Sequence, residues 1–465
     1  MRKILYSIFL LMLIPVVSIA RQDEPLLKVG VLSDVHLGHY NPKADSIFVR
    51  SLEYFKSYDV DAVIIAGDFL TDGTEDQMKK TADLWFSVFP DDKGRKGKHV
   101  ERIFVYGNHE IDGHKYAIAL KRYTEDYLKE HNIADNREEY WEKYFHEPFQ
   151  PFYRKDIKGY TFLAAHYVNP SESPGMAEFF EKEKATFPSV DKPMFYIQHK
   201  HPKGTVPWYP DNGVSTEILS QYPNIICFSG HCHHSLTDEK SIWQGSFTCI
   251  NTASLRRMSS RHYLENGAIG AKDKEQGYVP QMAEVSHRHA HHCMFMKVYA
   301  DRVELDKYDL HYGEVFDTWT IPTDVTNRPY APEARKAQGA LFPPIFKKKA
   351  SVRVERVLGK DRDGTRVQQV QVFFPLAETQ KGGLRALNYE VVAEQQDGDS
   401  IKQITSRIVY PPRYFLGENA LNQYEPACYF AEDVLPKGVP IRFAVYPMDS
   451  WDNKGTPIHS KFMVL

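Results

Sequence analysis

Residues 27–36 read LKVGVLSDVH, an apolar run that ends on a carboxylate and an imidazole. A continuously apolar run of this length, bounded by polar residues, is typical of a strand that is buried on both faces. Asp34 and His36 stand two positions apart, so on an extended strand end their side chains would project in the same direction. The stretch predicts the first strand of a buried sheet, with two metal-ligand side chains at its carboxyl end.

Two further apolar runs, at residues 62–65 and 102–106, also lead directly into polar residues. Between the runs, apolar residues at helical spacing predict helices over about residues 44–58 and 75–89. The resulting order of elements is β-α-β-α-β. It predicts an open α/β sheet with helices on its faces, because parallel strands need such crossovers.

Five short polar segments follow strand-like runs, and each contains metal-ligand side chains. They are Asp34-Val35-His36, Gly67-Asp68, Gly107-Asn108-His109-Glu110, Gln198-His199-Lys200-His201 and Gly230-His231-Cys232-His233-His234. Because strand ends of an open α/β sheet converge on one crevice, we expect these side chains to meet in one site. Imidazoles, carboxylates and an amide oxygen suit Mn, Zn, Fe or Ni better than Ca or Mg alone. The sequence therefore predicts a centre for two divalent transition metal ions.

In this order the segments resemble the motifs of the calcineurin-like metallophosphoesterase superfamily, over about residues 27–310. The resemblance implies a four-layer α/β/β/α sandwich that hydrolyses a phosphate ester by attack of a metal-bridging hydroxide. It implies that one ion is held by Asp34, His36, Asp68 and His233, and the other by Asp68, Asn108, His199 and His231. His109 would be the catalytic histidine, which binds no metal and protonates or stabilises the leaving oxygen.

Three details of the segments refine this resemblance. The fourth segment offers two histidines, and we choose His199 over His201 as the ligand because it stands closer to the strand end. Purple acid phosphatases have a tyrosine three residues after the Gly-Asp aspartate. This chain has Thr71 there, which argues against an iron–tyrosinate centre. Residues 69–73 are closer to the equivalent segment of class III cyclic-nucleotide phosphodiesterase-like members.

The expected substrate is therefore a small phosphate ester, with a phosphodiester favoured. A phosphomonoesterase, either a phosphatase or a nucleotidase, is the first alternative on the same fold. A non-catalytic metal-binding module is the second. The formal net charge of −3 argues against nucleic-acid binding, which usually requires a basic excess. Oligomeric state is not predicted by the sequence.

The first twenty residues are typical of a secretory signal peptide. Arg2 and Lys3 precede an apolar stretch that ends on the small-x-small site Ser18-Ile19-Ala20. We expect cleavage there, export to the periplasm or the extracellular space, and no stable membrane anchor afterwards.

A chain of 465 residues is too long for one typical core, so two domains are expected. The predicted division is residues 1–20 signal peptide, 21–321 catalytic domain, 322–346 linker and 347–465 a C-terminal β-sandwich. Short alternating strands separated by Gly, Asp and Pro predict this last domain. The segment 449–455 resembles the final loop of fibronectin type III-like domains, so the expected class is immunoglobulin/fibronectin-like.

Three other segments could bind ligands. The run from Ser286 to His292 is rich in histidine and could serve a metal-storage or sensor protein, although no carboxylates lie nearby in sequence. Arg256 and Arg257 could reach a substrate phosphate, although surface arginines are common. Trp208 and Tyr209 could stack on a base or an aryl leaving group, or pack on the domain instead.

Overall fold

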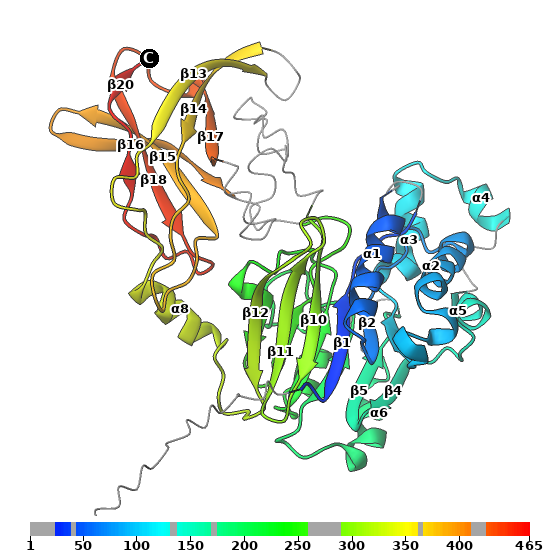
Figure 1. Ribbon diagram of the computed structural model, residues 1–465. Helices are drawn as coiled ribbons and strands as arrows, with labels where there is room; N and C mark the ends of the chain where they lie inside the picture. The colour runs from blue at the N-terminus through cyan, green and yellow to red at the C-terminus, as the bar shows by residue number, and fades with distance from the viewer. Residues whose placement is uncertain are drawn as a thin grey trace, which may run out of the picture.

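Two six-stranded sheets pack face to face in the N-terminal part of the chain (Figure 1). The computed structural model describes residues 24–38, 43–130, 137–168, 174–258, 290–360, 366–410 and 425–465. The first sheet has the order β12 (Glu314–Pro322), β11 (Arg302–Asp309), β10 (His292–Val298), β1 (Leu27–Leu32), β2 (Ala62–Ala66) and β3 (Glu101–Val105). The second has the order β4 (Phe152–Ile157), β5 (Tyr160–Ala165), β6 (Met194–Ile197), β7 (Ile225–Ser229), β9 (Thr248–Asn251) and β8 (Ile242–Gln244).

Alternate residues of the central strands enter different hydrophobic cores. Val31 and Ile64 of the first sheet share the core between the sheets with Phe195 and Phe228 of the second. The neighbouring Ile65 points the other way, into the core beneath the helices. Burial on both faces explains why these runs are continuously apolar, as parallel strands covered on both sides require. The parallel pairs β1–β2–β3 and β6–β7 bring the carboxyl ends of their strands to one edge of each sheet.

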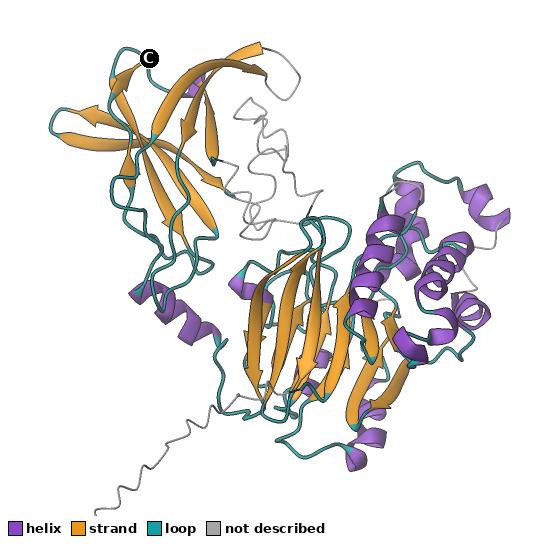
Figure 2. Ribbon diagram, in the orientation of Figure 1, coloured by secondary structure: helices purple, strands orange, loops and turns teal. Residues whose placement is uncertain are grey.

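Helices cover the outer face of each sheet, which completes the four layers α/β/β/α (Figure 2). The first sheet is covered by α1 (Ala44–Ser57), α2 (Glu75–Val88) and α5 (Arg137–Phe145), and the second by α6 (Met176–Glu183) and α7 (Val214–Leu219). Helix α3 (Asn108–Ala119) begins directly on a predicted site residue, and the short α4 (Glu125–Glu130) follows it. The predicted fold class is confirmed, and α1 and α2 lie where the apolar spacing placed them.

The C-terminal part of the chain consists of two antiparallel sheets around a separate core. One contains β13 (Arg353–Lys360), β14 (Arg366–Phe373) and β17 (Ala427–Ala431). The other contains β16 (Ser400–Val409), β15 (Asn388–Asp397), β18 (Pro440–Met448), β19 (Ile458–His459) and β20 (Met463–Val464). Val372 and Phe430 of the first sheet share this core with Val391 and Phe443 of the second. The expectation of an all-β domain is therefore confirmed, whereas its exact boundaries stay a prediction.

The predicted linker contains a helix, α8 (Pro332–Leu341), which was not predicted from the sequence. Pro332 is compatible with its first turn, where a missing N–H costs nothing. The side chain of Arg335 on this helix pairs with Glu239 of the α/β domain. Next to that contact, the backbone N–H of Glu239 donates to Ser450 Oγ at 3.0 Å, and Lys240 lies over the ring of Trp451. Polar contacts therefore join the two parts of the chain.

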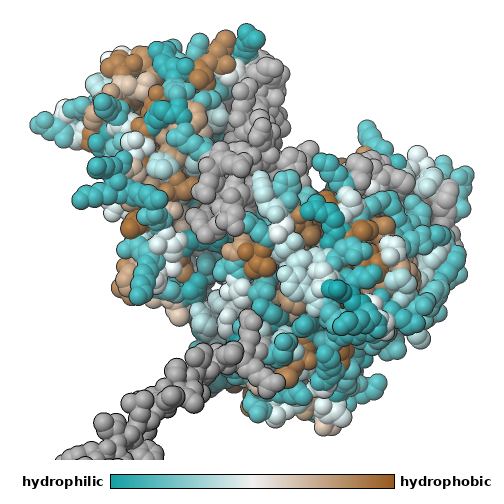
Figure 3. Space-filling view, in the orientation of Figure 1, coloured by the Kyte–Doolittle hydropathy of each residue, from teal (hydrophilic) through white to brown (hydrophobic). Residues whose placement is uncertain are grey.

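The face of the molecule in Figure 3 presents mostly hydrophilic residues, with small groups of hydrophobic ones between them. No helix in the described residues is long and apolar enough to cross a membrane. The predicted signal peptide, residues 1–20, lies outside the described residues.

Candidate metal centre

Asp34 and His36 leave β1 in a loop, not on the extended strand end that their spacing suggested. Both have left-handed backbone conformations, with φ of 50° and 51°. The N–H of Asp34 donates to the carbonyl of Gly67, and that of His36 donates to the carbonyl of Asp68, both at 3.0 Å. The loop after β1 is thus bonded to the loop after β2. The two side chains face one site because the backbone turns twice, and strand alternation is not the reason.

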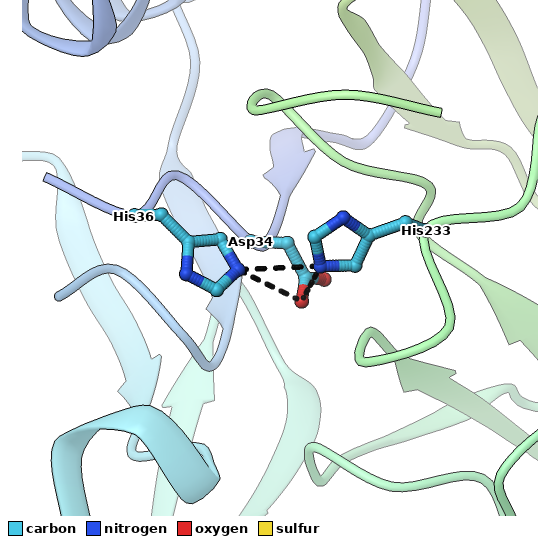
Figure 4. A group of neighbouring side chains, drawn as sticks. All are labelled: Asp34, His36 and His233. Atoms are coloured by element: carbon cyan, nitrogen blue, oxygen red, sulfur yellow. Dashed lines mark hydrogen bonds and ion pairs between the residues drawn. The ribbon is translucent and has the colours of Figure 1, made fainter. Parts of the chain in front are cut away.

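A first cluster joins Asp34 and His36 to His233, which follows β7 of the second sheet (Figure 4). His233 Nε2 lies 3.0 Å from Asp34 Oδ1, and His36 Nε2 lies 3.9 Å from the same oxygen. The two Nε2 atoms are 3.2 Å apart. All three residues are buried. Two imidazole nitrogens and a carboxylate oxygen that converge so closely are a ligand set for a cation.

A second cluster joins Asp68, Asn108, His199 and His231. His199 Nε2 lies 3.1 Å from Asp68 Oδ2 and 3.1 Å from Asn108 Oδ1. His199 Nδ1 lies 2.8 Å from the carbonyl of Ala66, which accepts its proton and leaves Nε2 directed at the site. A ring nitrogen of His231 completes a group with Asp68 and His199 in which ligand atoms lie within 4.8 Å of one another.

Asp68 connects the two clusters. Its Oδ2 atom lies 3.8 Å from His36 Nε2 as well as beside His199. Burial opposes the charge of Asp68, but His199, His109 and His36 hold the pKa of its carboxyl well below the usual range. Burial likewise lowers the pKa of His199, but Asp68 and Asp34 outweigh it and raise this pKa to about 10. The buried carboxylates therefore favour positive charge at this position, which is the electrostatic condition a metal ion satisfies.

Glu110 holds the loops after β2 and β3 together, a role that was not predicted from the sequence. Its Oε2 accepts hydrogen bonds from the backbone N–H of Asp68 at 3.0 Å and of Gly107 at 2.6 Å. Its Oε1 accepts one from Leu70 N at 2.7 Å. Burial and the charge of Asp68 raise the pKa of Glu110 to about 8. The signal in the sequence was an acidic residue directly after an apolar run and a turn, at the start of a predicted site, because a carboxyl buried there needs several hydrogen-bond donors.

His109, the predicted catalytic residue, lies beside the ligand clusters and is partly exposed. Its backbone N–H donates to Asp68 Oδ1 at 2.8 Å, and its ring stands edge-on to His36 with centroids 4.5 Å apart. Its Nδ1 lies 2.7 Å from the carbonyl of Thr71, which orients the ring. A ring nitrogen also lies within 4.8 Å of ligand atoms of His36 and Asp68.

All seven predicted ligands and His109 are thus brought together, while their roles as ligands and acid stay predictions. His199, rather than His201, reaches Asp68. His201 instead contacts Ser229 Oγ through Nδ1.

The other candidate segments have different surroundings. In the histidine run, His287 and His289 lie outside the described residues, and His291 Nδ1 lies 2.6 Å from the carbonyl of Leu255. Trp208 stacks on His234 with centroids 3.5 Å apart, as a packing residue would. Tyr209 is 60% exposed, and its ring centroid lies 5.8 Å from that of His231, at the rim of the site.

Residues 27–235 match the model of the calcineurin-like phosphoesterase family, a range that contains all eight predicted site residues. None of the curated proteins matches the sequence. Among solved structures, the chain is similar to a dimetal phosphatase from Danio rerio, at 11% identity with a TM-score of 0.36, covering 65% of this chain and 100% of that one. It is also similar to a purple acid phosphatase from yellow lupin, at 14% identity with a TM-score of 0.38, covering 65% and 55%. An anchor protein of the Plasmodium inner membrane complex is similar at 12% identity with a TM-score of 0.39, covering 64% and 88%.

Proposed function

We propose that this protein hydrolyses a phosphodiester. Its residues 27–235 belong to the calcineurin-like phosphoesterase superfamily, and the protein is a metal-dependent phosphoric ester hydrolase. The observation that supports the proposal most directly is the pair of ligand clusters that share Asp68. A bridging carboxylate between two groups of imidazoles is the arrangement that holds two cations close together.

Two divalent transition metal ions, chosen from Mn, Zn, Fe and Ni, fit this donor set. One would be held by Asp34, His36, Asp68 and His233, and the other by Asp68, Asn108, His199 and His231. When bound, such ions supply positive charge for the phosphoryl oxygens and lower the pKa of a coordinated water.

His109 would supply the proton that the leaving oxygen needs. Its ring is held by the Thr71 carbonyl at Nδ1, so that Nε2 is the atom left to reach the substrate. The backbone bond from His109 N to Asp68 Oδ1 couples the position of this ring to the bridging carboxylate. A proton donor in fixed register with the metals is the arrangement that cleavage of a P–O bond requires.

The preference for a diester rests on the segment 69–73, which resembles that of phosphodiesterase-like members. In the structure this segment supports the site, since Thr71 Oγ1 donates to the carbonyl of His36 at 2.9 Å. Phosphomonoester hydrolysis is the second candidate, because the additional cation Arg256 lies near the centre and would favour a dianionic ester.

The test is the hydrolysis of bis-p-nitrophenyl phosphate and p-nitrophenyl phosphate by protein loaded with Mn or Zn. We expect turnover that a chelator abolishes and that re-added metal restores, with a higher kcat/KM for the diester. A higher kcat/KM for the monoester would overturn the substrate preference. Absence of chelator-sensitive turnover on both esters would overturn the proposed activity and favour a binding module.

We further propose that the protein is exported after removal of residues 1–20. Expression of the full chain in a secreting bacterial host, followed by mass spectrometry, should yield a mature N-terminus at Arg21. Full-length protein retained in the cytoplasm would contradict this proposal.

A further inference from the structure

The segment that follows β9 is bonded to the loop that contains Asp34. Leu255 N donates to the carbonyl of Ser33 at 3.2 Å, and Arg256 N donates to the carbonyl of Asp34 at 3.0 Å. Ser254 Oγ donates to the same Asp34 carbonyl at 3.0 Å. Three hydrogen bonds thus fix the backbone of Arg256 relative to a predicted metal ligand.

The guanidinium of Arg256 is the cation that this backbone places beside the centre. It is partly buried, and its charge contributes to lowering the pKa of His36, after the larger effects of burial and of His109. Burial and the nearby Arg257 and Arg122 lower the pKa of Arg256 itself, while Asp68 opposes them. The charge of Arg256 therefore interacts with those of His36 and Asp68.

Within the described residues, no carboxylate forms an ion pair with Arg256. The nearby Arg122 differs in this respect, because it is also partly buried but is neutralised by Asp72 at 2.8 Å. An arginine that is partly desolvated without a counter-ion is costly unless an anion binds to it. Two predicted metal cations in the neighbouring clusters would add to the positive charge around Arg256. The site as a whole therefore favours an anionic ligand.

We propose that Arg256 binds the substrate phosphate through its non-bridging oxygens, and that it contributes more to the binding of a dianionic monoester than to that of the diester, which the site as a whole prefers. The planar guanidinium donates two parallel hydrogen bonds to such oxygens, which a lysine cannot do. This inference rests on the proposed function, because it assumes that a phosphate ester occupies the centre. In this arrangement Arg256 contacts the substrate directly and does not contact the metal ions.

The test compares Arg256→Gln and Arg256→Lys with the control Arg257→Gln, an exposed arginine one residue away. The measurements are calorimetric binding of inorganic phosphate to metal-loaded protein, KM and kcat for both aryl esters, and metal content. In Arg256→Gln we expect phosphate affinity to fall about 10- to 100-fold, as the loss of charged hydrogen bonds predicts. We expect KM to rise more for the monoester than for the diester, and Arg256→Lys to recover part of the loss.

Metal content should be unchanged in every variant, and Arg257→Gln should retain the phosphate affinity of the wild type. Wild-type phosphate affinity in Arg256→Gln would overturn the inference, and so would equal losses in the two glutamine variants. Loss of metal from Arg256→Gln would also overturn it, since the role would then be structural. If the wild-type protein bound phosphate but hydrolysed no ester, the proposed function would fail while the calorimetry still decided the role of Arg256.

Discussion

The Nδ1 atom of His109 lies 2.7 Å from the carbonyl oxygen of Thr71, in the loop that follows Asp68, the carboxylate that connects the two clusters. This contact fixes the ring without using the nitrogen that would serve the leaving group. The first prediction follows from it. His109→Ala should retain both metals and lose about 100- to 10,000-fold in kcat, the usual contribution of a general acid.

Elemental analysis and steady-state kinetics of the same preparation would check this result. His99→Ala is a suitable control, because His99 is exposed and its ring pairs with Glu101 at the surface, away from the clusters. Near-normal turnover in His109→Ala would remove the residue from the mechanism.

Asp68→Asn should lose metal, because the substitution keeps the shape of the side chain and removes the charge shared by the two clusters. We expect fewer than two ions per chain after gel filtration in metal-free buffer, and a large loss of activity. Asp83→Asn provides the control for loss of one acidic charge, because Asp83 is exposed and forms a surface ion pair with Lys79. Full occupancy by both ions in Asp68→Asn would contradict the bridging role.

Glu110→Gln should weaken metal binding without removing a predicted ligand. Glutamine offers one acceptor oxygen where three backbone N–H groups converge, and its amide group would face a donor. We expect metal affinity to fall about 10- to 100-fold, the range typical for groups that support ligands. Titration of metal into the apo-protein measures this effect, with the exposed Glu217→Gln as control. Unchanged affinity would mean that the loops hold their positions without Glu110.

Asp61 should make the stability of the α/β domain sensitive to acid. Burial opposes its charge, but hydrogen bonds from Lys158, Lys98 and the Lys28 backbone outweigh burial and lower its pKa below 3.8. A carboxyl whose pKa is lowered by folding stabilises the protein above its unfolded pKa, and this contribution is lost as the pH falls through the folded value.

Asp61→Asn should therefore cost about 2 kcal/mol at pH 7, and the difference from the wild type should shrink below about pH 4. Urea denaturation of the metal-free proteins at several pH values measures it. A difference that stayed constant down to pH 3 would contradict the assignment to this carboxyl.

The repeated pattern of an apolar run followed by ligand-type residues predicted an open α/β sheet and a set of side chains that meet in one site. The four-layer arrangement, the division of ligands between two ions and the role of His109 came from the resemblance to the metallophosphoesterases. Buried parallel strands require continuous apolar runs, and the ends of such strands converge. Position along the chain was also enough to prefer His199 over His201.

The parts that could not be predicted depend on backbone conformation and on long-range contacts. The left-handed conformations of Asp34 and His36 could not be predicted from residue type, because Asp and His adopt a positive φ at only a minority of their positions. Helix α8 lies in a segment without apolar periodicity. It is attached to the α/β domain by the ion pair between Arg335 and Glu239, and not by a row of buried apolar side chains. The environment of Arg256 depends on bonds to Ser33 and Asp34, more than two hundred residues away.

The predicted ligands are divided between the two sheets. Asp34, His36, Asp68 and Asn108 follow strands of the first, whereas His199, His231 and His233 follow strands of the second. Neither half alone offers a complete coordination shell, so a nascent chain in which only β1, β2 and β3 have formed cannot capture both ions. Metal should therefore bind late in folding, after the two sheets have packed together. Chelation should weaken the packing between the sheets before it unfolds either sheet.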